Sequence, residues 1–150
     1  PAFREIPEIH ILADNIEDRL GVMSFYVENI HFNLVVKLLS DRFGIQVRGG
    51  CACAGTYGHY LLEVTHEKSN EITNKINHGD LSEKPGWIRW SLHPTMTNQE
   101  VYDFADAIKQ IIANQTEWET DYIYNNKKNE FFHKDYPQET LQEVKNWFKI

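Results

Sequence analysis

The spacing of apolar side chains predicts two amphipathic helices. From Phe32 to Phe43, apolar residues recur every three or four positions, which is the period of one helix face. Gly44 follows directly, and glycine is typical just past a helix C-terminus because it adopts left-handed backbone angles without strain. A second helix is predicted to begin at Thr97, which forms a capping box with Glu100 and is followed by an apolar stripe that continues to Ile112.

Alternating and β-branched segments predict four short strands, at Glu8–Ala13, Arg19–Val27, Ile45–Arg48 and Trp87–Leu92. In the last of these, alternation places Arg89 on the side opposite Ile88 and Trp90. The order of the elements predicts an α/β fold, an α+β two-layer sandwich with helices packed on one face of a small mixed sheet.

The remaining segments predict shorter or less regular structure. We expect short helices at Thr56–Val64 and Glu67–Asn77, and a loop at Gly79–Gly86. Thr116–Lys134 is polar and aromatic, and we expect it to run over the surface and to be held there by its rings. Pro137 suits the first turn of a final helix. We therefore treat residues 1–150 as a single domain, in which residues 116–150 form an aromatic tail and a final helix.

Composition narrows the class of protein. The chain has 150 residues, of which 41% are hydrophobic and 25% charged, and this is ordinary globular composition. A net charge of −7 argues against nucleic acid or an anionic membrane as a partner. No apolar run approaches the roughly 18 residues that a membrane span needs, and Pro1–Asn15 does not resemble a secretory leader. Since the sequence begins with Pro1 and not with methionine, we expect a processed chain or part of a longer protein. The two cysteines have C-x-C spacing and cannot link distant segments by a disulfide, so we expect a reducing, cytoplasmic setting.

Both cysteines of the chain lie in one glycine-bounded stretch, Ile45–Gly55. Gly49 and Gly50 are expected to break the strand that delivers Arg48, so that Cys51 and Cys53 lie on a loop beside a cation. A neighbouring cation or helix N-terminus lowers the pKa of a thiol and makes it a better nucleophile. The alternative is that both cysteines are small apolar residues under a tight turn. Residue pattern alone leaves the two interpretations equally open.

Metal binding is the less favoured use of these thiols. The C-x-C spacing supplies two ligands at most, and the seven histidines do not form a zinc motif with them, so we expect no metal. His59 could serve as a base for Cys53. However, a histidine six residues away on a predicted helix more often has a structural role.

Arg89 is the second candidate for chemistry, because it lies mid-strand between Trp87 and Trp90. The planar guanidinium suits a carboxylate partner. Stacking on an aromatic ring or an internal salt bridge is the alternative. Together with Arg48, which also lies on a strand near a loop, Arg89 favours an anion site.

Four sequence blocks carry a family resemblance. They are RLGVMSF at Arg19–Phe25, DRFGI at Asp41–Ile45, VRGGCACA at Val47–Ala54 and KPGWIRWSL at Lys84–Leu92. Their order and spacing resemble the C-terminal small domain of class V, fold-type I enzymes that depend on pyridoxal 5′-phosphate (PLP), such as aminotransferases. The similarity is greatest to the cysteine desulfurase and selenocysteine lyase group, and it covers about Glu8–Ile112.

The resemblance implies roles for particular residues. Cys53 stands where these enzymes carry the cysteine that forms a persulfide, and Arg89 stands where they grip the α-carboxylate of the amino-acid substrate. Arg48 would hold the loop or the anionic substrate. Two positions depart from the desulfurase pattern, namely Cys51-Ala52 in place of histidines, and His93-Pro94-Thr95 in place of a tyrosine-containing stretch.

The resemblance also implies partners. PLP would be bound by a large domain that has no match in this sequence, and the complete enzyme would be a homodimer. Without the PLP lysine, this chain alone is expected to be inactive. An aminotransferase or β-lyase without persulfide chemistry is a second possibility, and a stand-alone binding or interaction domain is a third. If Phe3, Met23 or Trp87 lies on an exposed face, we expect that face to contact another domain or a second copy.

Overall fold

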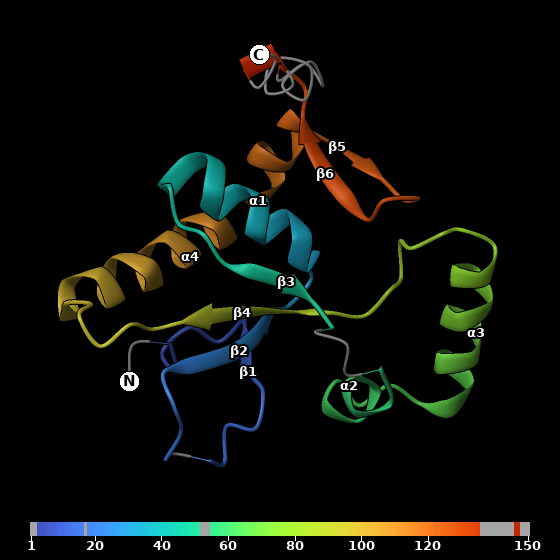
Figure 1. Cartoon of the computed structure of the whole chain (residues 1–150), viewed down its shortest axis with the longest axis horizontal. Helices are drawn as coiled ribbons and strands as arrows, with labels where there is room; N and C mark the ends of the chain where they lie inside the picture. Colours follow the sequence, from blue (N-terminus) through green and yellow to red (C-terminus); the bar gives the residue numbers. More distant parts are fainter. Residues whose placement is uncertain (1–2, 17, 52–54, 136–145, 148–150) are drawn as a thin grey trace.

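The computed structural model describes residues 3–16, 18–51, 55–135 and 146–147. Its centre is a four-stranded sheet in the order β1-β2-β4-β3, and its elements are shown in Figure 1. The sheet strands are β1 (Ile9–Ile11), β2 (Val22–Val27), β3 (Arg48–Gly50) and β4 (Trp87–Ser91). The helices are α1 (Phe32–Phe43), α2 (Gly55–Leu61), α3 (His66–Asn77) and α4 (Asn98–Trp118). A 3₁₀ turn, η1 (Glu119–Asp121), leads into a separate hairpin of β5 (Tyr122–Asn125) and β6 (Glu130–His133).

The hydrophobic core lies between one face of the sheet and the helices α1 and α4. The residues that are almost completely buried come from β2, β4 and these two helices, and include Phe25, Ile88, Leu38, Phe104 and Ile108. On β4, Trp90 stacks on Phe104 with ring centroids 4.1 Å apart. This arrangement confirms the predicted α+β two-layer fold. It also confirms the predicted alternation along β4, because Ile88 and Trp90 both face the core.

The ends of α1 and α4 are fixed by local hydrogen bonds. α1 ends at Gly44, whose φ of 66° is left-handed, as its sequence position predicts. In α4 the Thr97 side chain accepts from the Glu100 backbone N–H, and the Glu100 side chain accepts from the Thr97 backbone N–H. This capping box confirms the predicted start. The helix continues to Trp118, six residues past the predicted apolar stripe.

Three predictions about the strands are corrected by the structure. All pairings described in the sheet are antiparallel, so the sheet is not mixed. β3 covers Arg48–Gly50 and not Ile45–Arg48, so the two glycines form the strand instead of breaking it. The reason is close approach, since a Cβ built on Gly49 would lie 2.8 Å from Asn33 Oδ1 and 3.0 Å from Val36 Cγ2. Only a residue without a side chain lets β3 pack this closely on α1.

The segment predicted to run irregularly over the surface contains the β5–β6 hairpin. Its first strand is tied to α1, because the Tyr122 hydroxyl donates to Asp41 over 3.1 Å. Burial and the neighbouring Asp41 raise the pKa of Tyr122, so this hydroxyl remains a donor. The final helix predicted from Pro137 falls largely outside the described residues. Within the described part of the chain, no helix is long and apolar enough to span a membrane.

Candidate functional site

The register of the sheet brings three polar side chains into one row. Ser24 of β2 pairs with Arg89 of β4, and Arg89 pairs on its other side with Arg48 of β3. Side chains at directly opposed positions point to the same face of a sheet, with Cβ atoms about 5 Å apart. The structure therefore places the two arginines predicted from sequence next to each other.

This row lies on the sheet face opposite the core. Side chains alternate along a strand, and the residues on both sides of Arg89, Ile88 and Trp90, are buried in the core. α2 covers one end of the opposite face, since a Cβ on Gly58 would lie 3.2 Å from the Trp87 ring. Trp87 is accordingly buried, whereas Arg89 is half-buried and Arg48 is exposed.

The positive charge of the arginine pair is not neutralised within the described part of the chain. No carboxylate among those residues lies within ion-pair distance of Arg48 or Arg89. The cation–π contacts recorded there involve Arg42 and Lys128, so stacking does not account for Arg89 either. Arg89 Nε is buried without a hydrogen-bond partner. Like charges directly opposite each other are unfavourable, and an anion bound between them would offset that repulsion.

Tyr26 adds a hydroxyl to the same face, two residues beyond Ser24 on β2. Its ring stacks on His10, with centroids 4.7 Å apart. Burial, and then the negative charges of Glu63 and Glu28, raise the pKa of Tyr26, so the hydroxyl stays protonated and able to donate. The sequence reasoning missed Tyr26, although the period-two spacing from Ser24 could have shown that the two share a face.

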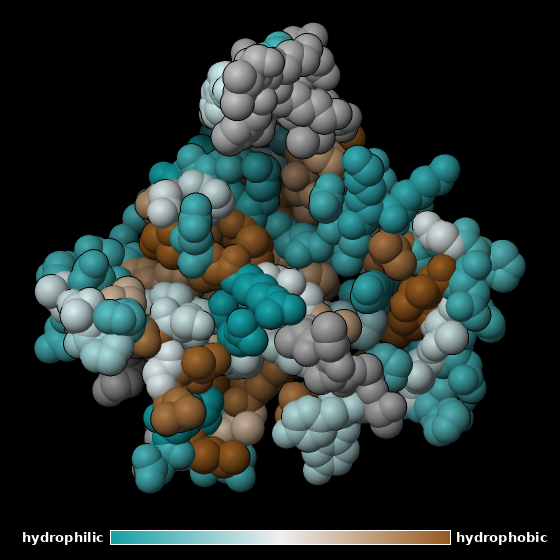
Figure 2. Space-filling view, viewed as in Figure 1, coloured by the Kyte–Doolittle hydropathy of each residue, from teal (hydrophilic) through white to brown (hydrophobic). Residues whose placement is uncertain are grey.

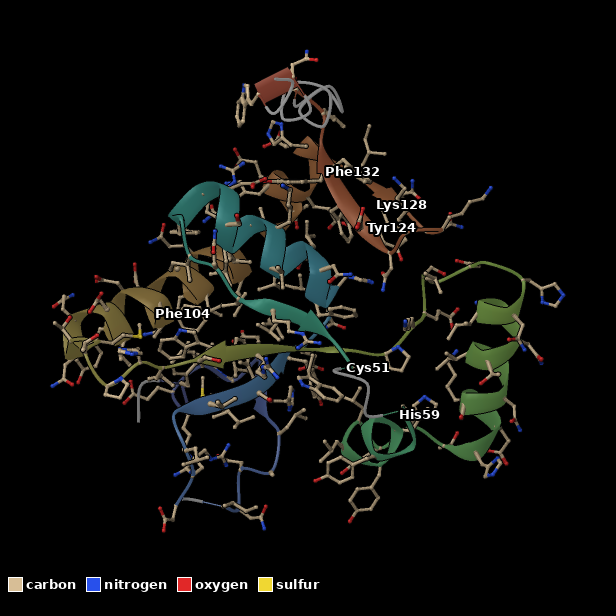
Figure 3. All side chains as sticks on the ribbon, in the orientation of Figure 1. Cys51, His59, Phe104, Tyr124, Lys128 and Phe132 are labelled. Carbon is tan, nitrogen blue, oxygen red and sulfur yellow. The ribbon has the colours of Figure 1, made fainter. Side chains whose placement is uncertain are left out.

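The structure describes Cys51 but not Cys53. Cys53 lies outside the described residues, so its predicted proximity to Arg48 is untested. Cys51 follows β3 as a half-buried free thiol. It lines an apolar cavity of about 150 Å³ together with His59 of α2. Figure 3 shows the two residues near the end of β3 and on α2.

His59 is held by a neighbouring helix. Its Nδ1 lies 2.8 Å from the Ser69 hydroxyl on α3, which fixes the orientation of the ring. The structure thus brings His59 to the same cavity as Cys51, while the predicted pairing of His59 with Cys53 stays a prediction. Among the described residues, no cluster of three or more His, Cys, Asp or Glu could hold a metal ion.

Comparison with known proteins identifies the family of the chain. The sequence model of the aminotransferase class-V family matches residues 2–104. The chain belongs to this family. The matched region contains both arginines of the row and both cysteines. No curated protein matches the chain.

Class V aminotransferases are generally PLP-dependent, and PLP enzymes hold the cofactor on a lysine. A lysine that forms a Schiff base lies desolvated in a pocket. None of the lysines in the described part of the chain is buried. Two of them, Lys68 and Lys75, form ion pairs with Glu83 on the surface. Among the described residues, no lysine therefore has the desolvated setting that a Schiff-base lysine needs.

The exposed apolar residues differ from those predicted to mark a contact face. Phe3 and Trp87 are only 7% and 5% exposed, and Met23 packs against the core. The exposed large apolar side chains include Ile16, Leu20 and Val22 around the β1–β2 connection, and Tyr57 and Tyr60 on α2. Figure 2 shows the apolar surface at the β1–β2 connection, at the bottom of the view.

Proposed function

We propose that this chain is the substrate-side small domain of a class V PLP-dependent enzyme that acts on an amino acid. The reaction we favour is removal of sulfur or selenium, as in cysteine desulfurases and selenocysteine lyases. The observation that supports the proposal is the register pairing of Arg48 with Arg89, two arginines at directly opposed positions on neighbouring strands. A carboxylate is the natural ligand of such a pair.

Each arginine of the row would have a defined part in binding. Arg89 would grip the α-carboxylate, because its buried Nε has no hydrogen-bond partner among the described residues and its two terminal nitrogens can donate in parallel. Arg48, which is more exposed, would add charge beside it. Fixing the carboxylate orients the rest of the substrate, and orientation of this kind contributes strongly to catalysis.

The sulfur chemistry would fall to Cys53. By the sequence resemblance, Cys53 stands where desulfurases carry the persulfide-forming cysteine, and its thiolate would attack the substrate sulfur as the carbon–sulfur bond of the substrate breaks. PLP, when bound, supplies an electron sink for amino-acid chemistry. We place its binding site in a large domain outside this sequence, in an enzyme that is homodimeric and cytoplasmic.

A class V aminotransferase or β-lyase without persulfide chemistry is the second candidate. It is favoured by the Cys51-Ala52 pair, which stands where the desulfurase pattern has histidines, and by His93-Pro94-Thr95 in the later block. The Arg48–Arg89 pair serves this candidate equally, because both kinds of enzyme hold the carboxylate of an amino acid.

The experiment that tests the proposal uses the protein purified from its natural source and its recombinant Cys53→Ser form. We expect the absorbance of bound PLP, formation of alanine from L-cysteine, and loss of that activity by roughly 100-fold or more in Cys53→Ser. The matched control is Cys51→Ser, which should retain alanine formation.

Three other results of this experiment would each contradict one part of the proposed function. A natural protein without PLP would overturn the enzyme assignment. Alanine formation that survives Cys53→Ser would remove the persulfide step. Transfer of an amino group to a keto acid, without sulfur release, would replace the desulfurase with the aminotransferase.

A further inference from the structure

A groove separates the sheet from the β5–β6 hairpin. It is a cavity of about 620 Å³, with its floor on α1, one wall on Gly49–Cys51 and the other wall on Lys128–Phe132 of the hairpin. Figure 3 shows Cys51 beside the sheet and Lys128 and Phe132 on the hairpin. The groove is separate from the Arg48–Arg89 pair, whose side chains stand on the sheet face opposite the core.

One wall of the groove is an open strand edge. β3 is the last strand of the sheet and pairs only with β4 in the described structure. Gly49 and Gly50 are half-buried and carry no side chains, so no side chain of their own shields the backbone of this edge. An edge of this kind presents unpaired N–H and C=O groups and can accept a further strand.

The charged side chains that line the groove are mostly lysines. Lys37, Lys84 and Lys128 line it, against one acidic residue, Glu130. Lys37 is paired with Asp41 at 3.2 Å. For Lys84 and Lys128, no carboxylate in the described part of the chain lies within ion-pair distance. This local positive charge contrasts with the net charge of −7 for the whole chain.

Apolar side chains also line the groove. Phe32 and Val36 do so on the floor formed by α1, and Phe131 and Phe132 on the hairpin wall. An extended peptide presents alternate side chains to opposite faces. A segment that alternates acidic and apolar residues would therefore direct one set to the lysines and the other to these apolar side chains.

We propose that the groove binds an acidic peptide segment of a partner protein, which adds a strand to the free edge of β3. The glycine edge supplies main-chain hydrogen bonds, and the lysines supply charge complementarity. A small anion would use the lysines but neither the strand edge nor the apolar side chains. A nucleic acid would bring its long polyanion against a chain that is itself strongly negative. The proposal does not depend on the function proposed above.

The test is a fluorescence anisotropy titration of the full chain with a labelled Glu-Val-Glu-Val-Glu peptide. We expect binding that weakens as salt is added, and about a fivefold weaker affinity in each of Lys84→Gln and Lys128→Gln. The matched control is Lys109→Gln, an exposed lysine of α4 outside the groove, which should bind as the wild type does. A peptide with methylated backbone nitrogens should bind markedly less well, because it cannot pair with the strand edge.

Four results would overturn the proposal. They are absence of binding at millimolar peptide, equal binding of a Lys-Val-Lys-Val-Lys peptide, equal loss of affinity in Lys109→Gln, and full binding of the methylated peptide. Tighter binding of labelled pentauridylate would assign the groove to nucleic acid instead. Displacement of the peptide by inorganic phosphate at equal concentration would assign it to small anions.

Discussion

Arg48 and Arg89 place two positive charges opposite each other on neighbouring strands. Because like charges in this position repel, Arg48→Gln should raise the free energy of unfolding by about 0.2–1 kcal/mol at low ionic strength. Added salt screens the exposed Arg48 and should reduce the gain. Urea denaturation of the isolated chain at two salt concentrations measures both effects.

The control for this prediction is Arg4→Gln. Arg4 lies in an exposed ion pair with Asp14 at 3.0 Å, so its removal should not stabilise the chain. A loss of stability in Arg48→Gln, at either salt concentration, would mean that Arg48 has a stabilising partner and would count against an anion site.

His31 links the start of α1 to the hairpin. Its Nδ1 accepts a hydrogen bond from the Asn33 backbone N–H, so this nitrogen must carry no proton. The ring lies against Phe32, Tyr124 and Phe131, with centroids 4.6 to 5.3 Å away. Burial lowers the pKa of His31 below its ordinary value of 6.5, and the nearby Asn129 side chain partly opposes the shift.

This lowered pKa predicts a dependence of stability on pH. The unfolded chain takes up a proton at His31 more readily than the folded chain does. The stability that depends on neutral His31 is therefore fully present above pH 6.5. It is lost as the pH falls from there toward the lower pKa of His31 in the folded chain. His31→Asn keeps a side chain that can cap α1 and should flatten the curve of unfolding free energy between pH 7.5 and 5. If His31→Asn kept the wild-type slope of unfolding free energy against pH, His31 would not be the cause of the pH dependence.

The packing of β3 on α1 depends on Gly49. A Cβ at this position would meet Asn33, Val36 and Phe32 at 2.8 to 3.1 Å. Gly49→Ala should therefore lower the free energy of unfolding by about 1–3 kcal/mol, because neither helix nor strand can move freely. Gln46→Ala, an exposed change shortly before β3, should stay within about 0.5 kcal/mol of the wild type. Equal stability of the two variants in urea denaturation would contradict the close approach.

The elements with local signals were predictable from sequence. Local capping signals mark α1 and α4, namely Gly44 at the end of α1 and the Thr97 capping box at the start of α4. Both helices begin where the apolar pattern predicts. The predicted position of β3 was wrong because glycine normally breaks a strand. Only the contact of Gly49 with α1 shows why a glycine is needed in this strand. The β5–β6 hairpin was missed because its stability comes from contacts with a distant helix, such as the Tyr122–Asp41 hydrogen bond.

The two arginines of the candidate site were predictable from sequence, but Tyr26 and the geometry of the site were not. Sequence singled out Arg89 because an arginine on an aromatic strand needs a partner, and Arg48 because it lies on a strand beside the glycine-bounded cysteines. The two arginines oppose each other because β3 pairs with β4. This pairing joins residues 41 positions apart, and the sequence near either arginine carries no signal for it. The same limit applies to the groove, which combines β3 with a hairpin about 80 residues later in the chain.

The molecule as a whole uses the two faces of its sheet differently. One face carries α1, α4 and the hydrophobic core, and the other carries the arginine row, Tyr26 and the partial cover of α2. The second face is flanked by exposed apolar side chains such as Leu20 and Tyr60. Its free charge and exposed apolar border are what a substrate-side domain of a class V enzyme would present to a larger partner.

The most direct test of this account is the Michaelis constant of the natural enzyme for its amino-acid substrate in the Arg89→Gln variant. Loss of the carboxylate contact should raise KM by about 10- to 100-fold, since hydrogen bonds to a charged group contribute about 1.5–3 kcal/mol. Arg89→Lys should recover only part of that loss, because lysine cannot donate in parallel to both carboxylate oxygens. Arg4→Gln, the surface control, should leave KM unchanged. An Arg89→Gln enzyme that keeps the wild-type KM would contradict the assignment of the arginine row as the carboxylate site.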